Sequence, residues 1–255
     1  MRVHYDSDIH LEFMKKIPKI QVMADVLCLA GDIGYPFSGI YKDFLIKMST
    51  SFKKVFLIAG NHEYYNKDRD MHTIEQLQEK ITSVIAENNL KNVSFLNRST
   101  EEYEGVTFVG ATLWSDISHL NTHDTELMND FFRIQKMDFQ RYYDLHREDY
   151  KFLSGVVQPA ALEKKDKKMV IMTHHMPSFD FIADKYKLDL RYKRLNAFFA
   201  TDCSALFQPP VTAWIYGHTH TPGLHIKDGI TFACNPKGYP SESQTMAFHV
   251  LEVKL

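Results

Sequence analysis

Residues 54–63 read KVFLIAGNHE, in which a short apolar run passes directly into a glycine, an amide, an imidazole and a carboxylate. The run over 54–59 is rich in branched and aromatic residues and is bounded by polar sequence, which predicts a buried strand. Several other apolar runs along the chain also end in residues that can bind a metal ion. Where the strands of a sheet are parallel, ligands bind beyond their carboxyl ends. We therefore expect the loops after these runs to converge on one site.

Short apolar runs alternate with segments of helical spacing, which predicts an α/β protein. Strands are expected over 2–6, 25–30, 54–59, 93–96, 105–112, 168–173, 211–216, 223–228, 230–234 and 245–252. Helices are expected over 38–50, 70–88, 141–156 and 195–207. Because Lys227-Asp228-Gly229 is typical of a hairpin turn, the C-terminal strands are expected to be antiparallel and the sheets mixed.

The composition is that of a folded protein with nearly balanced charge. The 255 residues include 30 Lys and Arg against 32 Asp and Glu, and 44% of them are hydrophobic. This balance argues against a protein that binds nucleic acid non-specifically through an overall positive electrostatic field.

The chain starts in polar sequence and no run approaches the roughly 20 apolar residues of a membrane span, so a cytoplasmic protein without a membrane partner is expected. Cys28, Cys203 and Cys234 are interpreted as small core residues.

One domain over 1–255 is favoured, because no linker rich in Pro, Gly or Ser and no internal repeat interrupts the chain. The polar stretch 115–150 is expected to be a cap or an insertion. The sequence leaves the oligomeric state open.

Five loops after predicted strands carry potential metal ligands. They are 6–10 (DSDIH), 31–34 (GDIG), 60–63 (GNHE), 174–177 (HHMP) and 217–220 (GHTH). Each motif alone is weak, because a single His or Asp-x-His more often caps a helix or lies on the surface. All five in order, each at a strand end, are specific for a metal site.

This ordered set resembles the calcineurin-like metallophosphoesterase family, whose pattern is Asp-x-His, Gly-Asp, Gly-Asn-His-Glu, His and Gly-His-x-His. The match runs from Asp8 to His220. The resemblance implies a two-sheet mixed β-sandwich flanked by helices, in four layers, with a binuclear metal centre. One metal would be bound by Asp8, His10, Asp32 and His220, and a second by Asp32, Asn61, His174 and His218, so that Asp32 bridges the two.

The chemistry of such a centre suits these residue types. Two divalent ions about 3.5–4 Å apart can clamp a phosphate, hold a hydroxide at neutral pH and stabilise the attacking and leaving oxygens. Imidazoles combined with carboxylate and amide oxygens suit Mn, Fe, Zn, Ni or Co better than Mg or Ca, and Mn²⁺ is the first expectation. The prediction is a hydrolase that cleaves a small-molecule phosphate ester through metal-activated hydroxide.

The sequence leaves two questions about histidines open: which of His174 and His175 binds the metal, and whether His62 contacts the substrate. His174 directly follows its strand and is preferred as the ligand, with His175 in reserve. The resemblance places His62 where it can stabilise the phosphoryl oxygens or protonate the leaving group, although a purely structural histidine is the alternative. In the protein-phosphatase branch that histidine pairs with an Asp at a position that is Tyr35 here. Because a weaker acid would then result, we expect a phosphodiester or nucleotide-type substrate.

Candidates for substrate contacts are less specific. Arg133 is suggested as a residue that could hold a phosphate. The loop 235–240 (NPKGYP) resembles a Gly-Tyr-Pro loop of small bacterial and phage members. Because it follows the strand after Gly-His-Thr-His, it could place Asn235 and Lys237 near the site, and a rigid turn is the alternative. The segment 184–194 could cradle a phosphate and stack a base, or could be an exposed helix or loop. A third metal site at His119 and His123 is a weaker hypothesis.

Two other functions are considered beside the phosphoesterase. A catalytically silent binding scaffold could reuse the same fold, but it has no physical need for a complete ligand set. A nuclease would need a basic groove, which the modest charge does not support, and its binding to an oligonucleotide would depend on salt.

Overall fold

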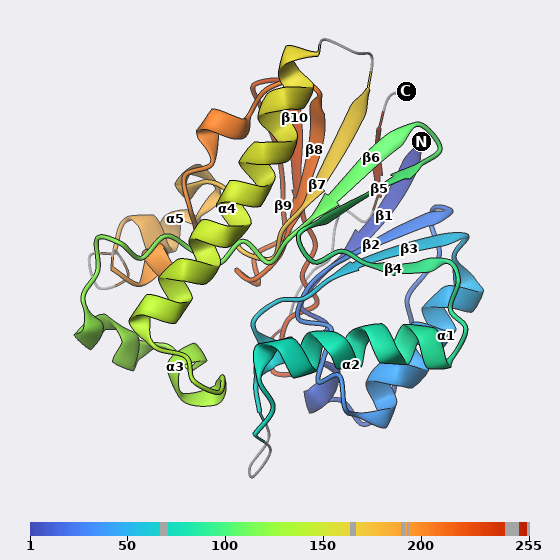
Figure 1. Ribbon diagram of the computed structural model, residues 1–255, viewed down its shortest axis with the longest axis horizontal. Helices are drawn as coiled ribbons and strands as arrows, with labels where there is room; N and C mark the ends of the chain where they lie inside the picture. Colours follow the sequence, from blue (N-terminus) through green and yellow to red (C-terminus); the bar gives the residue numbers. More distant parts are fainter. Residues whose placement is uncertain (67–70, 164–166, 190–191, 193, 243–249, 254–255) are drawn as a thin grey trace.

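The computed structural model describes residues 1–66, 71–163, 167–189, 192, 194–242 and 250–253. Its strands form two mixed sheets that lie face to face, with helices on both outer sides (Figure 1). This is the α/β, four-layer arrangement that the sequence predicts. Met1 lies beside the end of strand β11 (Val250–Glu252), because its amino group donates to Val253 O.

The first sheet carries three of the five predicted ligand loops. Its strand order is β11-β1-β2-β3-β4, and β1 to β4 are parallel, whereas β11 is antiparallel to β1. The strands are β1 (Arg2–Asp6), β2 (Val26–Ala30), β3 (Lys54–Ile58), β4 (Val93–Phe95) and β11 (Val250–Glu252). The central strands β2 and β3 are buried along their whole length, as expected of parallel strands covered on both faces.

The second sheet carries the other two loops. Its order is β5-β6-β7-β8-β10-β9, in which β6, β7, β8 and β10 are parallel and the two edge strands are antiparallel. The strands are β5 (Ser99–Tyr103), β6 (Val106–Gly110), β7 (Lys168–Met172), β8 (Val211–Tyr216), β9 (Gly223–Lys227) and β10 (Ile230–Cys234). The predicted hairpin turn after Lys227 joins β9 to β10.

The core divides into three layers because each sheet is apolar on both faces. Between the sheets, side chains of the first sheet such as Tyr5 and Phe56 face those of the second such as Phe108 and Met172. Phe56 and Phe108 stack with ring centroids 4.1 Å apart. The two outer layers bury the apolar faces of the flanking helices. Such close packing fixes the sheets, and therefore the loops at their ends, relative to one another.

Helices α1 (Gly39–Ser51) and α2 (Ile74–Glu87) cover the first sheet, and α4 (Phe139–Leu162) covers the second (Figure 1). Helix α2 begins with a capping box between Thr73 and Gln76, and Asp138 caps the start of α4 by accepting a hydrogen bond from the Arg141 amide. The short helices are α3 (Asp130–Arg133), α5 (Asp184–Lys187) and the 3₁₀ turns η1 (Leu11–Phe13), η2 (His62–Tyr64), η3 (Thr122–Leu127), η4 (Phe179–Phe181), η5 (Leu195–Phe198) and η6 (Ser204–Leu206). No helix among the described residues is long and apolar enough to cross a membrane.

Two sequence predictions of local structure are wrong. The helix expected over 195–207 is instead two 3₁₀ turns, because the main chain between them bonds to Met176, which donates to Phe199 O and accepts from Thr201 N. Strand β5 was not expected, since its polar sequence lies at an exposed sheet edge. The strand predicted over 245–252 is present as Val250–Glu252, and 245–249 lie outside the described residues.

The stretch 115–150 folds into η3, α3 and the first part of α4. It reaches the ends of the first sheet through Asp130, which accepts a hydrogen bond from the Asn61 amide. Its role as a cap stays a prediction.

Candidate metal centre

The carboxyl ends of β1, β2, β3, β7 and β8 meet at one edge of the sandwich, and the loops that follow them carry the predicted ligands. These loops bond to one another through their main chains: Asp8 N donates to Gly31 O, and Gly217 N donates to His174 O. Several candidate ligands have left-handed backbones, with φ between 47° and 69°: Asp8, His10, Asp32, His218 and His220. Residues other than glycine rarely adopt this backbone conformation, and such backbone strain concentrates at functional sites.

Two glycines of the motifs allow the loops to approach closely. A Cβ atom at Gly31, whose φ is 84°, would lie 2.6 Å from both Gly60 N and His174 Nδ1. A Cβ atom at Gly60 would overlap Asp32 and His174. The glycines before Asp32 and Asn61 are therefore required by the packing of the candidate ligands themselves.

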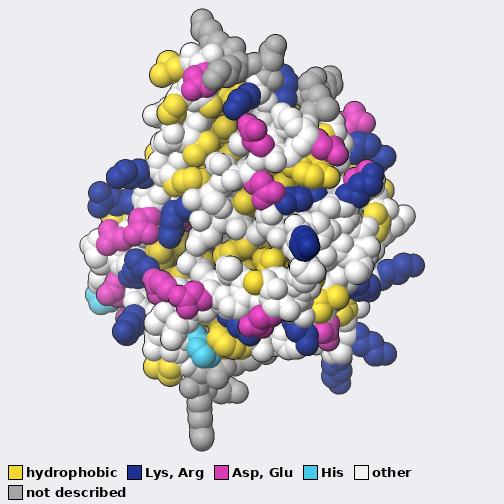
Figure 2. Space-filling model, turned by 45° about the vertical axis from the view of Figure 1, so that its right-hand side comes forward, with side chains coloured by type: hydrophobic (Ala, Val, Ile, Leu, Met, Phe, Trp, Pro, Cys, Tyr) yellow, Lys and Arg dark blue, Asp and Glu magenta, His cyan; other side chains and the backbone are white. Residues whose placement is uncertain are grey.

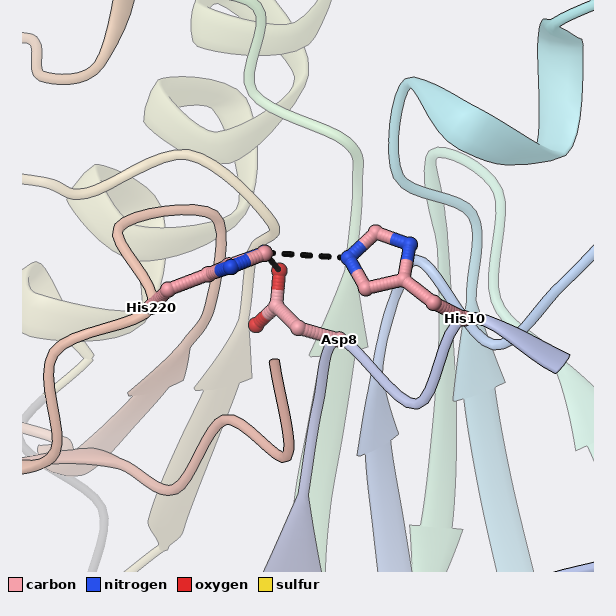
Figure 3. Close-up of side chains that lie close together, drawn as sticks. All are labelled: Asp8, His10 and His220. Atoms are coloured by element: carbon pink, nitrogen blue, oxygen red, sulfur yellow. Dashed lines mark hydrogen bonds and ion pairs between the residues drawn. The ribbon is translucent and has the colours of Figure 1, made fainter. Parts of the chain in front are cut away.

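Asp8, His10 and His220 form the first group of candidate ligands. Figure 3 shows the two imidazoles pointing toward each other, with the Asp8 carboxylate beside them. The Nε2 atoms of His10 and His220 are 2.9 Å apart, and His220 Nε2 is 3.5 Å from Asp8 Oδ1. The side chain of His10 is fully buried. Two imidazole nitrogens and one carboxylate oxygen within 4.8 Å of one another make a donor set suited to a transition-metal ion.

Asp32, His174 and His218 form a second group, all buried. His174 Nε2 lies 3.4 Å from Asp32 Oδ2 and 3.1 Å from Asn61 Oδ1. His218 Nε2 is buried without a hydrogen-bond partner among the described residues. A buried imidazole nitrogen of this kind is costly unless it binds something, which fits a metal ligand.

Asp32 lies between the two groups. Its Oδ2 atom is 3.4 Å from His174 Nε2 on one side and 3.9 Å from His10 Nε2 on the other. Its Oδ1 atom accepts a hydrogen bond of 2.8 Å from the amide of His62, which also belongs to a group with His10 and Asp32. The structure thus places candidate ligands of both predicted metal ions, and the candidate substrate-binding residue His62, around the carboxylate of Asp32.

Of the two adjacent histidines, His174 faces this cluster. Its Nδ1 atom donates to Ala30 O at 2.9 Å, which leaves Nε2 directed at Asp32 and Asn61. His175 packs instead with its ring centroid 4.2 Å from that of His218 and 5.5 Å from that of Trp114. Burial, followed by the charge of His174, lowers the pKa of His175 to about 3.

We expect His174→Ala to lose one bound ion, because it removes an imidazole that points between Asp32 and Asn61. His175→Ala should keep both ions and instead lower the melting temperature, since it opens a void in buried packing. Metal counting by mass spectrometry of dialysed protein measures the difference. Loss of an ion only in His175→Ala would reverse the assignment.

The charges of the cluster stabilise protonated imidazoles when no metal is bound. Burial opposes protonation, but the charge of Asp32 outweighs it and raises the pKa of His174 to about 10. Burial likewise opposes protonation of His220, but Asp8 raises its pKa to about 9. Burial alone would raise the pKa of the two carboxyls, yet the facing histidines hold both below the ordinary value, and that of Asp32 well below it.

These shifts predict that metal binding tightens as the pH rises. At neutral pH His174 and His220 carry protons that an ion must displace, so binding releases protons and becomes roughly tenfold tighter per pH unit for each proton released. Calorimetric Mn²⁺ titrations between about pH 6 and 8, in buffers of different ionisation enthalpy, measure both effects. An affinity that does not change with pH would contradict the assignment of these ligands.

A model of the calcineurin-like phosphoesterase family matches residues 2–222. The chain belongs to this family. It is 32% identical over 262 residues to the uncharacterized protein L509 of Acanthamoeba polyphaga mimivirus, and the match covers 95% of this chain and 93% of that protein. The solved structure of the phosphopantetheinyl hydrolase PptH of Mycobacterium tuberculosis has the same fold, with a TM-score of 0.67 at 19% identity, over 93% of this chain and 89% of that one. With its His and Asp clusters, this member of the family is a metal-dependent phosphoesterase.

Four carboxylates that support the candidate ligands were not identified from the sequence: Glu63, Glu242, Asp130 and Glu12. Glu63 accepts hydrogen bonds from the amides of Asp32, Ile33, Gly34 and Gly60 and joins two ligand loops. Its position within the GNHE motif was the available signal.

Glu242 and Asp130 support single ligands. Glu242 Oε2 accepts from His220 Nδ1 at 2.7 Å and from the amide of Tyr239 at 2.8 Å. Asp130 Oδ1 accepts from the amide of the Asn61 side chain at 2.8 Å, which orients the Asn61 oxygen toward His174. No sequence pattern indicates these two residues, because each contact joins distant loops.

Glu12 supplies the carboxylate partner of His62 that position 35 lacks. Tyr35 is buried and packs near Phe37, so no carboxylate reaches His62 from that position. However, His62 Nδ1 donates to Glu12 Oε1 at 2.9 Å. His62 therefore has a carboxylate partner from another loop, and the expected preference for a diester or nucleotide-type substrate stays a prediction.

The three residues predicted to contact the substrate lie outside the groups of candidate metal ligands. Asn235 is buried, and its amide donates to Tyr5 O and Asp6 Oδ1, which gives it a structural role beside β1. Lys237 lines a hollow with His4 and Asp6, while its main-chain amide donates to Ser7 O. Arg133 is exposed at the end of α3.

The remaining hypotheses concern segments further along the chain. His123 is exposed and pairs loosely with Glu126, and the groups of candidate ligands among the described residues do not include it or His119. The segment 184–194 contains α5, and positions 190, 191 and 193 lie outside the described residues. Its binding role stays a prediction.

A cavity of about 220 Å³ adjoins the metal centre on the side of α5 and η5. It includes Thr219, which stands between the candidate ligands His218 and His220, and Phe199, whose ring centroid is 4.8 Å from that of His218. Its wall is mainly apolar and aromatic, formed by Ile182, Ala183, Tyr186, Tyr192, Leu195, Asn196, Phe199, Thr219 and Thr221. A cavity with such a wall suits an aromatic or apolar organic group.

Proposed function

We propose that this phosphoesterase hydrolyses a small-molecule phosphate ester with two divalent metal ions, Mn²⁺ first among them and Fe, Zn, Ni or Co as alternatives. The observation that carries the proposal is the position of Asp32 between two groups of histidines. The proposed ligands are Asp8, His10, Asp32 and His220 for one ion, and Asp32, Asn61, His174 and His218 for the other. When bound, the ions would stabilise charge on the phosphate oxygens and activate water at neutral pH.

The proposed role of His62 is to contact the phosphoryl or leaving-group oxygen. Its Nδ1 atom is held by Glu12, and its Nε2 atom lies 3.2 Å from the hydroxyl of Tyr239. Burial opposes its protonation, but the charge of Asp32 and the Glu12 contact raise the pKa of His62 above its ordinary value. A larger protonated fraction at neutral pH supports a donor of a hydrogen bond or a proton.

For the organic part of the substrate we propose a nucleotide-type or other aromatic group. The cavity beside Thr219, with Tyr186, Tyr192 and Phe199 in its wall, supports this choice. A nucleic-acid substrate receives less support: the net charge is −2, and the face drawn in Figure 2 mixes Lys and Arg with Asp and Glu.

The experiment is a comparison of kcat/KM for bis-p-nitrophenyl phosphate and p-nitrophenyl phosphate, with Mn²⁺-loaded protein and a chelator-treated blank. A preference for the diester would direct the search to cyclic nucleotides and dinucleotides. A preference for the monoester would direct it to nucleotide or sugar phosphates. Failure to cleave either ester with Mn, Fe, Zn, Ni or Co would contradict the proposal and favour the binding scaffold.

A further inference from the structure

Glu12 joins two imidazoles from loops far apart in the sequence. It lies in η1, directly after the β1 loop, and its side chain is only 10% exposed. One oxygen, Oε1, is 3.0 Å from His10 Nδ1 and 2.9 Å from His62 Nδ1. The ring centroids of the two histidines are 4.5 Å apart. A single carboxylate oxygen therefore contacts both a candidate metal ligand and the histidine that faces the substrate.

The chemistry of the carboxylate sets the state of both rings. An ionised carboxylate only accepts hydrogen bonds, so each Nδ1 atom must carry a hydrogen. In the neutral imidazole the lone pair is then on Nε2, which is the atom that can bind a metal or accept from a donor. Metal-binding histidines commonly donate their other N–H to a carboxylate, which fixes the tautomer and the ring orientation.

The two Nε2 atoms point into the site, as this arrangement requires. His10 Nε2 faces His220 Nε2 at 2.9 Å within the first group of ligands (Figure 3). His62 Nε2 faces the Tyr239 hydroxyl, which can donate to it across 3.2 Å. Tyr239 also lies close to the first group, with its ring centroid 4.5 Å from that of His10 and 4.7 Å from that of His220. His62 is thus held on both nitrogens, by the Glu12 carboxylate on one side and the Tyr239 hydroxyl on the other.

We propose that Glu12 is the positioning residue that couples the metal centre to His62, by accepting hydrogen bonds from the Nδ1 atoms of His10 and His62 so that both Nε2 atoms are directed into the site. This inference rests on the proposed function for its effect on turnover. Glu12 itself lies behind the two rings and acts through them. Through His10 it strengthens metal binding, because the Nε2 lone pair is directed at the ion. Through His62 it supports the contact with the phosphoryl or leaving-group oxygen, because a carboxylate on Nδ1–H favours the ring form that also carries a hydrogen on Nε2 and can donate it.

The first test compares Glu12→Ala with Glu12→Gln. Changes to residues that support metal ligands typically cost 10–100-fold in affinity or activity, and we expect a loss in that range for Glu12→Ala in both Mn²⁺ affinity and kcat. Glu12→Gln keeps an oxygen acceptor of the same shape and should recover activity to within about tenfold of the unaltered protein. Glu126→Gln, at the exposed Glu126 and His123 pair, is the matched control and should change nothing. Full activity and affinity in Glu12→Ala would overturn the inference.

A double-mutant cycle separates the two roles of Glu12. In the His62→Ala background, Glu12→Ala should still weaken Mn²⁺ binding through His10. However, it should no longer lower kcat at saturating Mn²⁺, because its partner in turnover is already absent. An equal fall in kcat in both backgrounds would show that Glu12 acts on turnover without His62, and would overturn that part of the inference.

Nitrogen NMR of the metal-free protein gives a readout that does not depend on activity. At alkaline pH, His10 and His62 should carry hydrogen on Nδ1, and Glu12→Ala should shift both toward the other tautomer. Hydrogen on Nε2 in the unaltered protein would overturn the inference. If no ester is cleaved with any metal, the proposed function fails, whereas the tautomers and the Mn²⁺ affinity still decide the role of Glu12.

Discussion

Replacing Asp32 with Asn is expected to lower kcat/KM of the Mn²⁺-loaded protein by roughly a thousandfold or more, because metal charge contributes several kcal/mol to such reactions. The Asp32 carboxylate stands between His10 and His174, so its charge would serve both ions. Asn has the same shape, and its oxygen can still accept the hydrogen bond from the His62 amide. The variant should therefore fold and lose activity together with at least one ion.

The measurements are kcat/KM on the better p-nitrophenyl ester, the number of bound ions and the melting temperature. Asp43→Asn, which changes an exposed carboxylate of α1 beside Lys42, serves as the matched control and should behave like the unaltered protein. Asp32→Asn that retains two ions and normal kcat/KM would contradict the bridging role.

The pattern of strand ends made the metal centre predictable from the sequence. Parallel strands are apolar along their length, as β2 and β3 are, so their ends are visible where the apolar run stops. Because those ends share one edge, Asp32 and Asn61 could be placed together without knowledge of the packing. The family resemblance implied which side chain would serve which ion, an assignment that stays a prediction, and the structure brings side chains of this set within reach of one another.

Residues that act through contacts between distant loops could not be predicted in this way. Glu12 follows His10 by two positions, but its contact with His62 exists only because η1 and η2 pack together. The identity of residue 35 could therefore not show whether His62 has a carboxylate partner, because that partner comes from η1. The helix expected over 195–207 failed for a similar reason, because its main chain bonds to Met176 rather than to itself.

Replacing Glu63 with Ala is expected to have the largest effect on stability. The fully buried carboxylate accepts from four amides, those of Asp32 and Gly60 through Oε2 and those of Ile33 and Gly34 through Oε1. Each buried amide left without a partner costs about 1–3 kcal/mol, and some relaxation will occur. We expect the free energy of unfolding to fall by about 3–5 kcal/mol and the melting temperature by roughly 10 °C.

The loss should extend to metal binding, because Glu63 ties the loop that carries Asp32 to the loop that begins at Gly60 and carries Asn61. Glu63→Gln keeps one acceptor oxygen but turns an NH₂ group toward the remaining amides, so it should fall between Glu63→Ala and the unaltered protein. Glu102→Ala, at an exposed ion pair with Lys167, is the control for loss of a carboxylate. Calorimetric melting of all three measures the effect. If Glu63→Ala melts within a degree or two of the control and still binds two ions, the four amide contacts do not hold the ligand loops together.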